Sequence, residues 1–404
     1  MKAVSAPEQT KKALVLPGAG ARGAYQVGVL KALATMLPES APNPFAIISG
    51  TSAGAVNAAV LASRASRFCG AVSDMEAVWA NFRAHQVYKT DSWTMLKSSA
   101  HWLASIVFGG FGIGTPLSLL DNSPLRELLA ESVRFSRIDR AIKRGHLDAL
   151  AITASGYTSA RSVTFFEGKE DLLPWSRVRR YGRRATLGLD HLMASAAVPL
   201  IFPPVLMGSE YFGDGAMRQH APLSSAIHLG AERILVIGVR DEHPDAEPNV
   251  PGEADYPSLA QIGGYMLDTL FMDGLYSDLE RLTRLNLILE QIEYAKLSGP
   301  VGGLKPINTL IILPTEDIRE IAMRHVHELP RALRILLRGI GAMNKGGLRL
   351  ISYLLFETGF TRELIDMGFR DAMAMEEDLR GFIFDQTIDT LDAQPDIKRG
   401  LLSR

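Results

Sequence analysis

Two strand–turn–helix units follow one another in the first 63 residues, and they restrict the fold more than any other part of the chain. A short apolar run at 12–17 leads into glycines and then into a helical pattern that continues to about Leu37. A second run at Phe45–Ser49 leads into Gly50–Gly54 and a helix of small residues. Parallel strands joined by a helix present their turns at the same edge of a sheet. The pattern therefore predicts an α/β fold in which the two glycine-rich turns lie side by side.

Later segments extend this prediction over most of the chain. Ser123-Pro124 is a good helix start, with serine as the cap and proline in the first turn. Further strands are expected at Leu147–Thr153, Ser162–Phe166, Arg233–Val239 and Asn308–Leu313. Continuous apolar runs such as the last two suit strands that are buried on both faces. We predict a three-layer α/β/α sandwich with a mostly parallel central sheet over residues 12–314, and a C-terminal helical region over 315–404 packed on or beside it.

Composition excludes several classes of protein. The net charge of −1 gives no general attraction to nucleic acid, so no nucleic-acid partner is expected. Cys69 is the only cysteine, which excludes an internal disulfide framework and a cysteine-based zinc site. The first apolar run is too short for the core of a signal peptide. Glycines and a proline interrupt the least charged stretch, Trp102–Leu120, so it is not expected to span a membrane. We therefore expect a cytoplasmic protein.

The second turn carries a candidate nucleophile. Ser52 is the central residue of Gly50-Thr51-Ser52-Ala53-Gly54, which follows an apolar strand and precedes a helix. A serine at such a sharp turn needs a strained backbone, and flanking glycines remove the steric clash. The turn would lift the hydroxyl into the open, beside the amides at the start of the following helix. The alternative is a tight β–α turn that needs its glycines and carries a serine without a catalytic role.

The first turn allows three interpretations. Gly18, Gly20 and Gly23 match the dinucleotide-binding fingerprint, with Ala19 and Arg22 between them. That fingerprint also requires an acidic residue at the end of the second strand, where this chain has Ile48-Ser49-Gly50. Alternatively, the loop lies beside Ser52 and its amides hold a developing oxyanion. The third possibility is an ordinary β–α turn.

The general base has two candidates. Asp214 ends a predicted strand and is bracketed by Gly213, Gly215 and Ala216, so its turn could press a carboxylate against a hydroxyl. An Asp-Gly pair is more commonly a solvated turn. Among the nine histidines, His220 is the best placed, six residues after Asp214. A histidine base would indicate a Ser–His–Asp esterase of the α/β-hydrolase type.

Taken together and in this order, the three motifs resemble those of patatin-like phospholipases, in particular the bacterial lipid acyl hydrolases with a Ser–Asp dyad. Ala194–Pro199 resembles the small-residue helix of that family, and Leu120–Arg126 also resembles family sequence. The resemblance covers roughly residues 12–240. It is weaker for 365–372, which is similar to a helix that follows the catalytic core in bacterial members.

The resemblance implies an α/β catalytic domain that hydrolyses lipid or other acyl esters, of the phospholipase A, lysophospholipase or lipase type. It implies Ser52 as nucleophile, Asp214 as base without a histidine, and an oxyanion hole from the amides of Gly18, Ala19 and Gly20. Ala19 stands where the family often has a glycine, but its amide donor is retained. Arg22 is expected to fix the loop. No cofactor and no metal are implied.

Contact with a membrane is expected of a lipid hydrolase, here peripherally at the inner membrane face. The helix after Pro330 places Leu333, Leu336, Leu337 and Ile340 on one face and Arg331, Arg334 and Arg338 on the other. Such a helix can lie in a membrane surface, or it can pack on the core with its arginines in water. The stretch Trp102–Leu120 could form an apolar lid or pack within the protein.

Overall fold

The structure is a computed structural model, and it describes residues 10–90, 118–240, 256–291, 304–343 and 345–385. The strands are β1 (Lys12–Leu16), β2 (Ile47–Thr51), β3 (Ala149–Gly156), β4 (Ser162–Gly168), β5 (Trp175–Arg177), β6 (Arg180–Arg184), β7 (Val205–Met207), β8 (Glu210–Asp214), β9 (Arg233–Ile237) and β10 (Asn308–Ile312).

The helices of the N-terminal half are α1 (Gly23–Thr35), α2 (Ala53–Ser63), α3 (Phe68–Trp79), α5 (Ser123–Ser132), α6 (Ser136–Lys143), α7 (Leu189–Ser195) and α8 (Ser224–His228). Those that follow are α9 (Leu259–Asp268), α10 (Gly274–Gln291), α11 (Ile318–His325), α12 (Arg331–Gly339), α13 (Leu348–Leu354), α14 (Thr358–Ala374) and α15 (Glu376–Ile383). A short π-helical segment, Thr269–Asp273, joins α9 to α10. Most of the apolar stretch predicted as a lid, 102–117, and most of the loop after Arg240 lie outside the described residues.

The strands form one sheet in the order β10-β9-β1-β2-β3-β4-β6-β5, with β8 also paired to β3 and β7 to β8. From β10 to β3 every neighbouring pair is parallel. Beyond β3 the sheet is mixed, because β4 and β8 both run antiparallel to β3. The turn between β3 and β4 is short, and a short turn can join only antiparallel strands. The predicted α/β sandwich is confirmed, with a block of five parallel strands from β10 to β3 and one further parallel pair, β4 and β6.

Strand boundaries differ from prediction for local reasons. β2 begins at Ile47, two residues after the predicted start at Phe45. The side chain of Asn43 donates to the carbonyl of Phe45 at 2.5 Å and accepts from its amide at 3.4 Å, which satisfies the backbone of Phe45 before the strand begins. Helix α5 forms where Ser123-Pro124 predicted it, but Asn122 occupies the cap position and Asp121 accepts the Ser123 amide.

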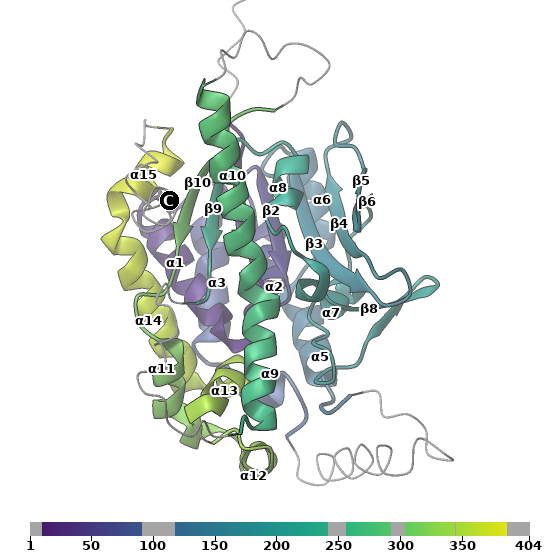
Figure 1. The fold of residues 1–404 in the computed structure, drawn as a ribbon. Helices are drawn as coiled ribbons and strands as arrows, with labels where there is room; N and C mark the ends of the chain where they lie inside the picture. The colour runs from purple at the N-terminus through teal and green to yellow at the C-terminus, as the bar shows by residue number, and fades with distance from the viewer. Residues whose placement is uncertain (1–9, 91–117, 241–255, 292–303, 344, 386–404) are drawn as a thin grey trace, which may run out of the picture.

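Helices cover both faces of the sheet (Figure 1). Helices α1, α2, α3 and α6 lie behind it in this view, and α8 and α10 cross in front. The C-terminal helix α14 packs along α1 so closely that a Cβ on Gly28 would lie 2.0 Å from the carbonyl oxygen of Ile365. Residues of α11 to α14 belong to the same hydrophobic core as the sheet. The described part of 315–404 is helical, as expected, while a domain boundary at residue 314 stays a prediction.

The structure shows whether helix α12, the helix after Pro330, packs on the core or is free to lie in a membrane surface. Leu333 and Leu337 on its apolar face are 1% and 2% exposed and belong to the core. Arg331 and Arg338 are exposed on the other side. The leucine face is therefore packed inside the protein and is not available to a bilayer.

Candidate active site

Ser52 occupies a strained turn between β2 and α2. Its backbone has φ 56° and ψ −129°, a region that side chains other than glycine rarely enter and that costs on the order of 1–3 kcal/mol. The Ser52 amide donates to the hydroxyl of Ser195 at 2.9 Å, and that hydroxyl donates to the carbonyl of Thr153 at 2.7 Å. Neighbouring segments thus hold the turn in a conformation that it would not adopt alone.

The glycine-rich loop lies beside this turn, as the sequence predicted. β1 and β2 are parallel neighbours, with Leu16 opposite Gly50. A Cβ on Gly54 would lie 2.2 Å from the carbonyl oxygen of Leu16, so only glycine allows α2 to start this close to the loop. Gly20 and Ser52 line the same cavity.

The loop conformation accommodates the alanine at position 19. Ala19 has φ −144°, which alanine adopts without strain, whereas Gly20 has φ 52°. Among the turn and loop hydrogen bonds of the described residues, none is donated by the amide of Gly18 or Ala19. Neither amide is therefore committed to a turn or loop hydrogen bond, and Gly20, the next residue of the loop, lines the cavity.

Arg22 is buried and points away from the cavity into the C-terminal part of the chain. Its side chain, only 2% exposed by residue, donates from Nε and Nη2 to the hydroxyl of Ser352 at 2.9 and 2.7 Å. Nη1 lies 3.3 Å from Asp268 Oδ1 in α9. These contacts support the expected role of Arg22 as an anchor of the loop.

Asp214 ends β8 at the same edge of the sheet. Its amide donates to the carbonyl of Ala197 at 2.8 Å, and its Oδ1 accepts the Ala216 amide at 2.9 Å. Its Oδ2 is buried and has no hydrogen-bond partner within the described residues. Burial raises the pKa of Asp214 to about 7, against the lowering effects of the Ser52 hydroxyl and the Ala216 amide. A carboxylate near neutral pKa, open on one oxygen and close to a serine hydroxyl, is suited to accept a proton.

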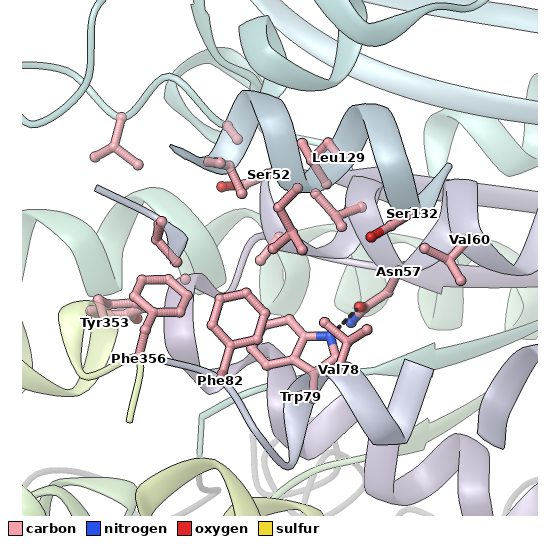
Figure 2. Close-up of a pocket in the computed structure, with 18 of the residues that line it drawn as sticks. Ser52, Asn57, Val60, Val78, Trp79, Phe82, Leu129, Ser132, Tyr353 and Phe356 are labelled. Carbon is pink, nitrogen blue, oxygen red and sulfur yellow. Dashed lines mark hydrogen bonds between the residues drawn. The ribbon is translucent and has the colours of Figure 1, made fainter. Parts of the chain in front are cut away.

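A cavity of about 320 Å³ contains Ser52 in its lining and follows α2. Its walls come from α2, α3 and α5, and the lining is mostly apolar. In Figure 2, Val60 and Ser132 lie toward one end of the cavity, Tyr353 and Phe356 lie toward the other, and Ser52 lies between them. The one polar side chain midway, Asn57, is satisfied because it accepts from the Trp79 indole at 2.9 Å. The cavity therefore suits a chain of methylene groups.

Seven of the nine histidines are described, and none of these seven lines this cavity or hydrogen-bonds to Ser52 or Asp214. His220, the best histidine candidate, is exposed. His101 and His243 lie outside the described residues. Within the described chain, the geometry favours Asp214 over a histidine as the partner of Ser52.

One expectation about Ser52 is wrong. The sequence predicted an exposed hydroxyl, but Ser52 is 2% exposed and faces the cavity. Leu267, Phe271 and Tyr353, which are far away in sequence, help to line the cavity around it. The ring of Phe271 lies so near the loop that a Cβ on Gly18 would be 2.3 Å from it. No local motif marks these three residues.

Sequence reasoning also assigned no role to Ser195, which holds the Ser52 amide. In the sequence, Ser195 stands out only as part of the segment Ala194–Pro199 that resembles a family helix. Gln219 is a second such residue: it accepts from the Thr51 hydroxyl at 2.6 Å and so joins the end of β2 to the turn after Asp214.

Two further findings concern the described residues only. They contain no group of three or more His, Cys, Asp and Glu side chains placed to hold a metal ion. None of their helices combines the length and the apolar character needed to cross a bilayer.

Comparison with known proteins gave one family. The model of the family described as patatin-like phospholipase matches residues 14–227, which is more than half of the chain. No curated protein matched. Among solved structures, the chain is similar to the crystal structure of VipD from Legionella pneumophila, with 12% sequence identity and a TM-score of 0.36. That alignment covers 92% of this chain and 67% of the other.

Proposed function

Because this chain belongs to the patatin-like phospholipase family, a family of lipid acyl hydrolases, we propose that it cleaves carboxylic esters of lipids through an acyl-Ser52 intermediate with Asp214 as general base. One observation carries the proposal. The strained Ser52 lines an apolar cavity, and beside it Asp214, whose pKa burial raises and the Ser52 hydroxyl lowers, keeps a buried Oδ2 without a hydrogen-bond partner among the described residues.

In the first half of the reaction, Asp214 accepts the hydroxyl proton of Ser52 while Oγ bonds to the ester carbonyl carbon. The carbonyl oxygen becomes an oxyanion, for which the amides of Gly18, Ala19 and Gly20 are the proposed donors. When the intermediate collapses, the C–O bond to the alcohol breaks and the alcohol takes the proton from Asp214. The acyl chain stays on Ser52 and extends along α2.

In the second half, a water molecule gives a proton to Asp214 and attacks the acyl carbon. The bond to Oγ breaks, Ser52 regains the proton, and the carboxylic acid leaves. The raised pKa of Asp214 suits this role, because a base whose pKa lies near the working pH both accepts and returns a proton readily.

The cavity favours substrates with long acyl chains. These are the glycerolipids on which enzymes of the phospholipase A, lysophospholipase or lipase type act. Most of the walls away from Ser52 are apolar, formed by side chains such as Val56, Val60 and Leu129, and the charged pair Arg64 and Asp74 lies only where α2 ends. An assay of phospholipids, lysophospholipids and triacylglycerols with wild type beside Ser52→Ala tests the proposal. We expect fatty-acid release from at least one class by wild type only. Release by a folded Ser52→Ala protein would reject this site.

We also propose a peripheral membrane contact at α9. Leu259, Ile262 and Met266 lie on one face of this helix and are 72%, 42% and 57% exposed, with Tyr265 beside them. On the other face, Leu267 lines the cavity that contains Ser52. An anionic lipid surface fits this region, because α12 with exposed Arg331 and Arg338 lies at the same end of the molecule (Figure 1). A lipid entering beside α9 would thus be close to the catalytic end of the cavity.

A further inference from the structure

A second cavity, of about 500 Å³, lies at the opposite end of α2 from Ser52 and adjoins the first cavity, because Arg64 and Asp74 line both. The end of α2, the start of α3 and helix α6 form its walls. Its lining contains five arginines, a histidine and a single carboxylate, namely Arg64, Arg67, Arg137, Arg140, Arg144, His146 and Asp74. We call this cavity the arginine pocket.

The arginine pocket concentrates positive charge that the protein does not neutralise. Among the described residues, only Arg64 of the five arginines forms an ion pair, and its partner is Asp74. The lining therefore carries four excess positive charges with His146 neutral, in a chain whose net charge is −1. Burial and the charges of Arg137 and Arg134 lower the pKa of Arg64, which shows that like charges meet here at a cost. A bound anion would offset that repulsion.

The backbone adds to the positive electrostatic potential of the arginine pocket. Helix α3 starts at this pocket, with Arg67 as its cap residue and no acidic side chain in its first turn. Space beside Gly70 is open, because an added Cβ would meet nothing closer than Arg67 Cβ at 3.9 Å. The Phe68 amide donates to the carbonyl of Ala41, but the dipole at the start of this 12-residue helix still favours an anion on the side where the arginines already gather.

We propose that the arginine pocket binds a phosphate-bearing ligand. Guanidinium groups match the oxygens of phosphate in paired hydrogen bonds. A phosphate monoester or diphosphate also carries two or more negative charges, which can balance much of the excess positive charge of the lining. A lone carboxylate would leave most of the charge unpaired.

The position of the pocket favours a dissolved ligand over a lipid headgroup. Ser52 precedes α2 and Arg64 follows it, so the two lie about 18 Å apart along the helix axis, at 1.5 Å per residue. The α9 face belongs to the Ser52 end, since Leu267 lines the cavity there. The arginine pocket would therefore face away from a membrane bound through α9. The preference for a dissolved ligand over a lipid headgroup rests on the proposed membrane contact at α9. The proposal that the pocket binds phosphate does not depend on that contact.

Titration calorimetry of the full chain with inorganic pyrophosphate tests the proposal. We expect saturable binding to one site, weakened at least tenfold by Arg137→Gln with Arg140→Gln. Both side chains are exposed, so the double variant should fold. The matched control is Arg331→Gln with Arg338→Gln, two exposed arginines on α12, which should change the Kd less than twofold.

Vesicles containing phosphatidic acid distinguish the source of the phosphate. Their binding should be the same for wild type and the Arg137→Gln, Arg140→Gln variant. Absence of saturable pyrophosphate binding, or an equal effect of both double variants, would overturn the site. Loss of vesicle binding in the Arg137→Gln, Arg140→Gln variant would overturn the dissolved ligand in favour of a headgroup. None of these outcomes depends on Ser52, so ester hydrolysis can fail or hold independently.

Discussion

The guanidinium of Arg22 lies over the ring of Tyr353, 3.9 Å from its centre. The same ring belongs to the residues that line the Ser52 cavity, and its hydroxyl donates to Asp268 at 2.7 Å. Asp268 in turn is the ion-pair partner of Arg22. The loop that carries the proposed oxyanion donors is thus clamped to α9 and α13, two helices from the other end of the chain. A substitution at Arg22 should therefore change the rate of the reaction, although Arg22 itself does not contact the substrate.

Arg22→Lys tests this clamp, since lysine keeps the charge but loses the paired donors and the stacking. We expect kcat for a short ester to fall at least tenfold with KM within twofold, because the loop amides shift while the cavity remains. Losing buried charged hydrogen bonds should also cost about 1–3 kcal/mol of stability. Ser352→Ala is the milder variant, and it should lower kcat in the same direction. Arg362→Lys, at an exposed arginine, is the control. An unchanged kcat in folded Arg22→Lys protein would leave Arg22 as a purely structural residue.

The depth of the cavity predicts a dependence on chain length. Val60 lies toward the end far from Ser52 and is 9% exposed. Val60→Trp should fill that end, so turnover of a sixteen-carbon ester should fall at least tenfold relative to a four-carbon ester. Overpacking is expected to cost about 1–3 kcal/mol, which thermal unfolding would reveal. Val60→Ala should leave the preference for long chains intact. If Val60→Trp slowed both esters equally, the acyl chain would lie elsewhere.

Vesicle binding tests the α9 face. Ile262→Ser with Met266→Ser removes two exposed apolar side chains, each contributing up to about 1.5–3 kcal/mol when fully buried in lipid. Partition onto anionic vesicles should fall at least tenfold. Leu173→Ser, at a leucine that is 75% exposed near β5, is the matched control and should have no effect. Arg331→Gln with Arg338→Gln should weaken binding mainly at low salt, because exposed charges are screened. Equal partition of the α9 variant and the Leu173 control would exclude this face.

What could be predicted from the sequence is mostly what neighbouring residues determine. The apolar runs before Gly18 and Gly50 locate β1 and β2, and their parallel pairing follows from the helix between them. Phe271 and Tyr353 could not be located in this way, because packing brings them to Ser52 from more than 200 residues away. The helix after Pro330 shows a further limit. A leucine stripe has the same spacing whether it faces a core or a bilayer, and only the structure places Leu333 inside.

The identity of the base gives the most discriminating prediction. If Asp214 must be ionised, activity should rise with pH and level off above about 7, the value to which burial raises its pKa. A histidine would titrate at nearly the same pH, so variants must decide. Asp214→Asn should lose almost as much activity as Ser52→Ala, because the two groups act as a unit. Each of the nine histidines, including His101 and His243, should be replaceable by alanine in folded protein with most turnover retained. A single histidine variant as inactive as Ser52→Ala would reject the dyad.

Stability provides an independent readout of the same carboxyl group. The pKa of Asp214 is raised from 3.8 to about 7 on folding, so the native state holds its proton more tightly than the unfolded state does. Wild type should therefore lose stability through this group as pH rises from about 4 to about 7, with no further loss above that. Asparagine does not titrate, so the unfolding free energy of Asp214→Asn minus that of wild type should grow over the same interval. Chemical denaturation at pH 4, 5.5, 7 and 8.5 measures this difference. A difference that stays constant with pH would mean that burial does not raise the pKa of Asp214, and the proposed proton acceptor would lose its physical basis.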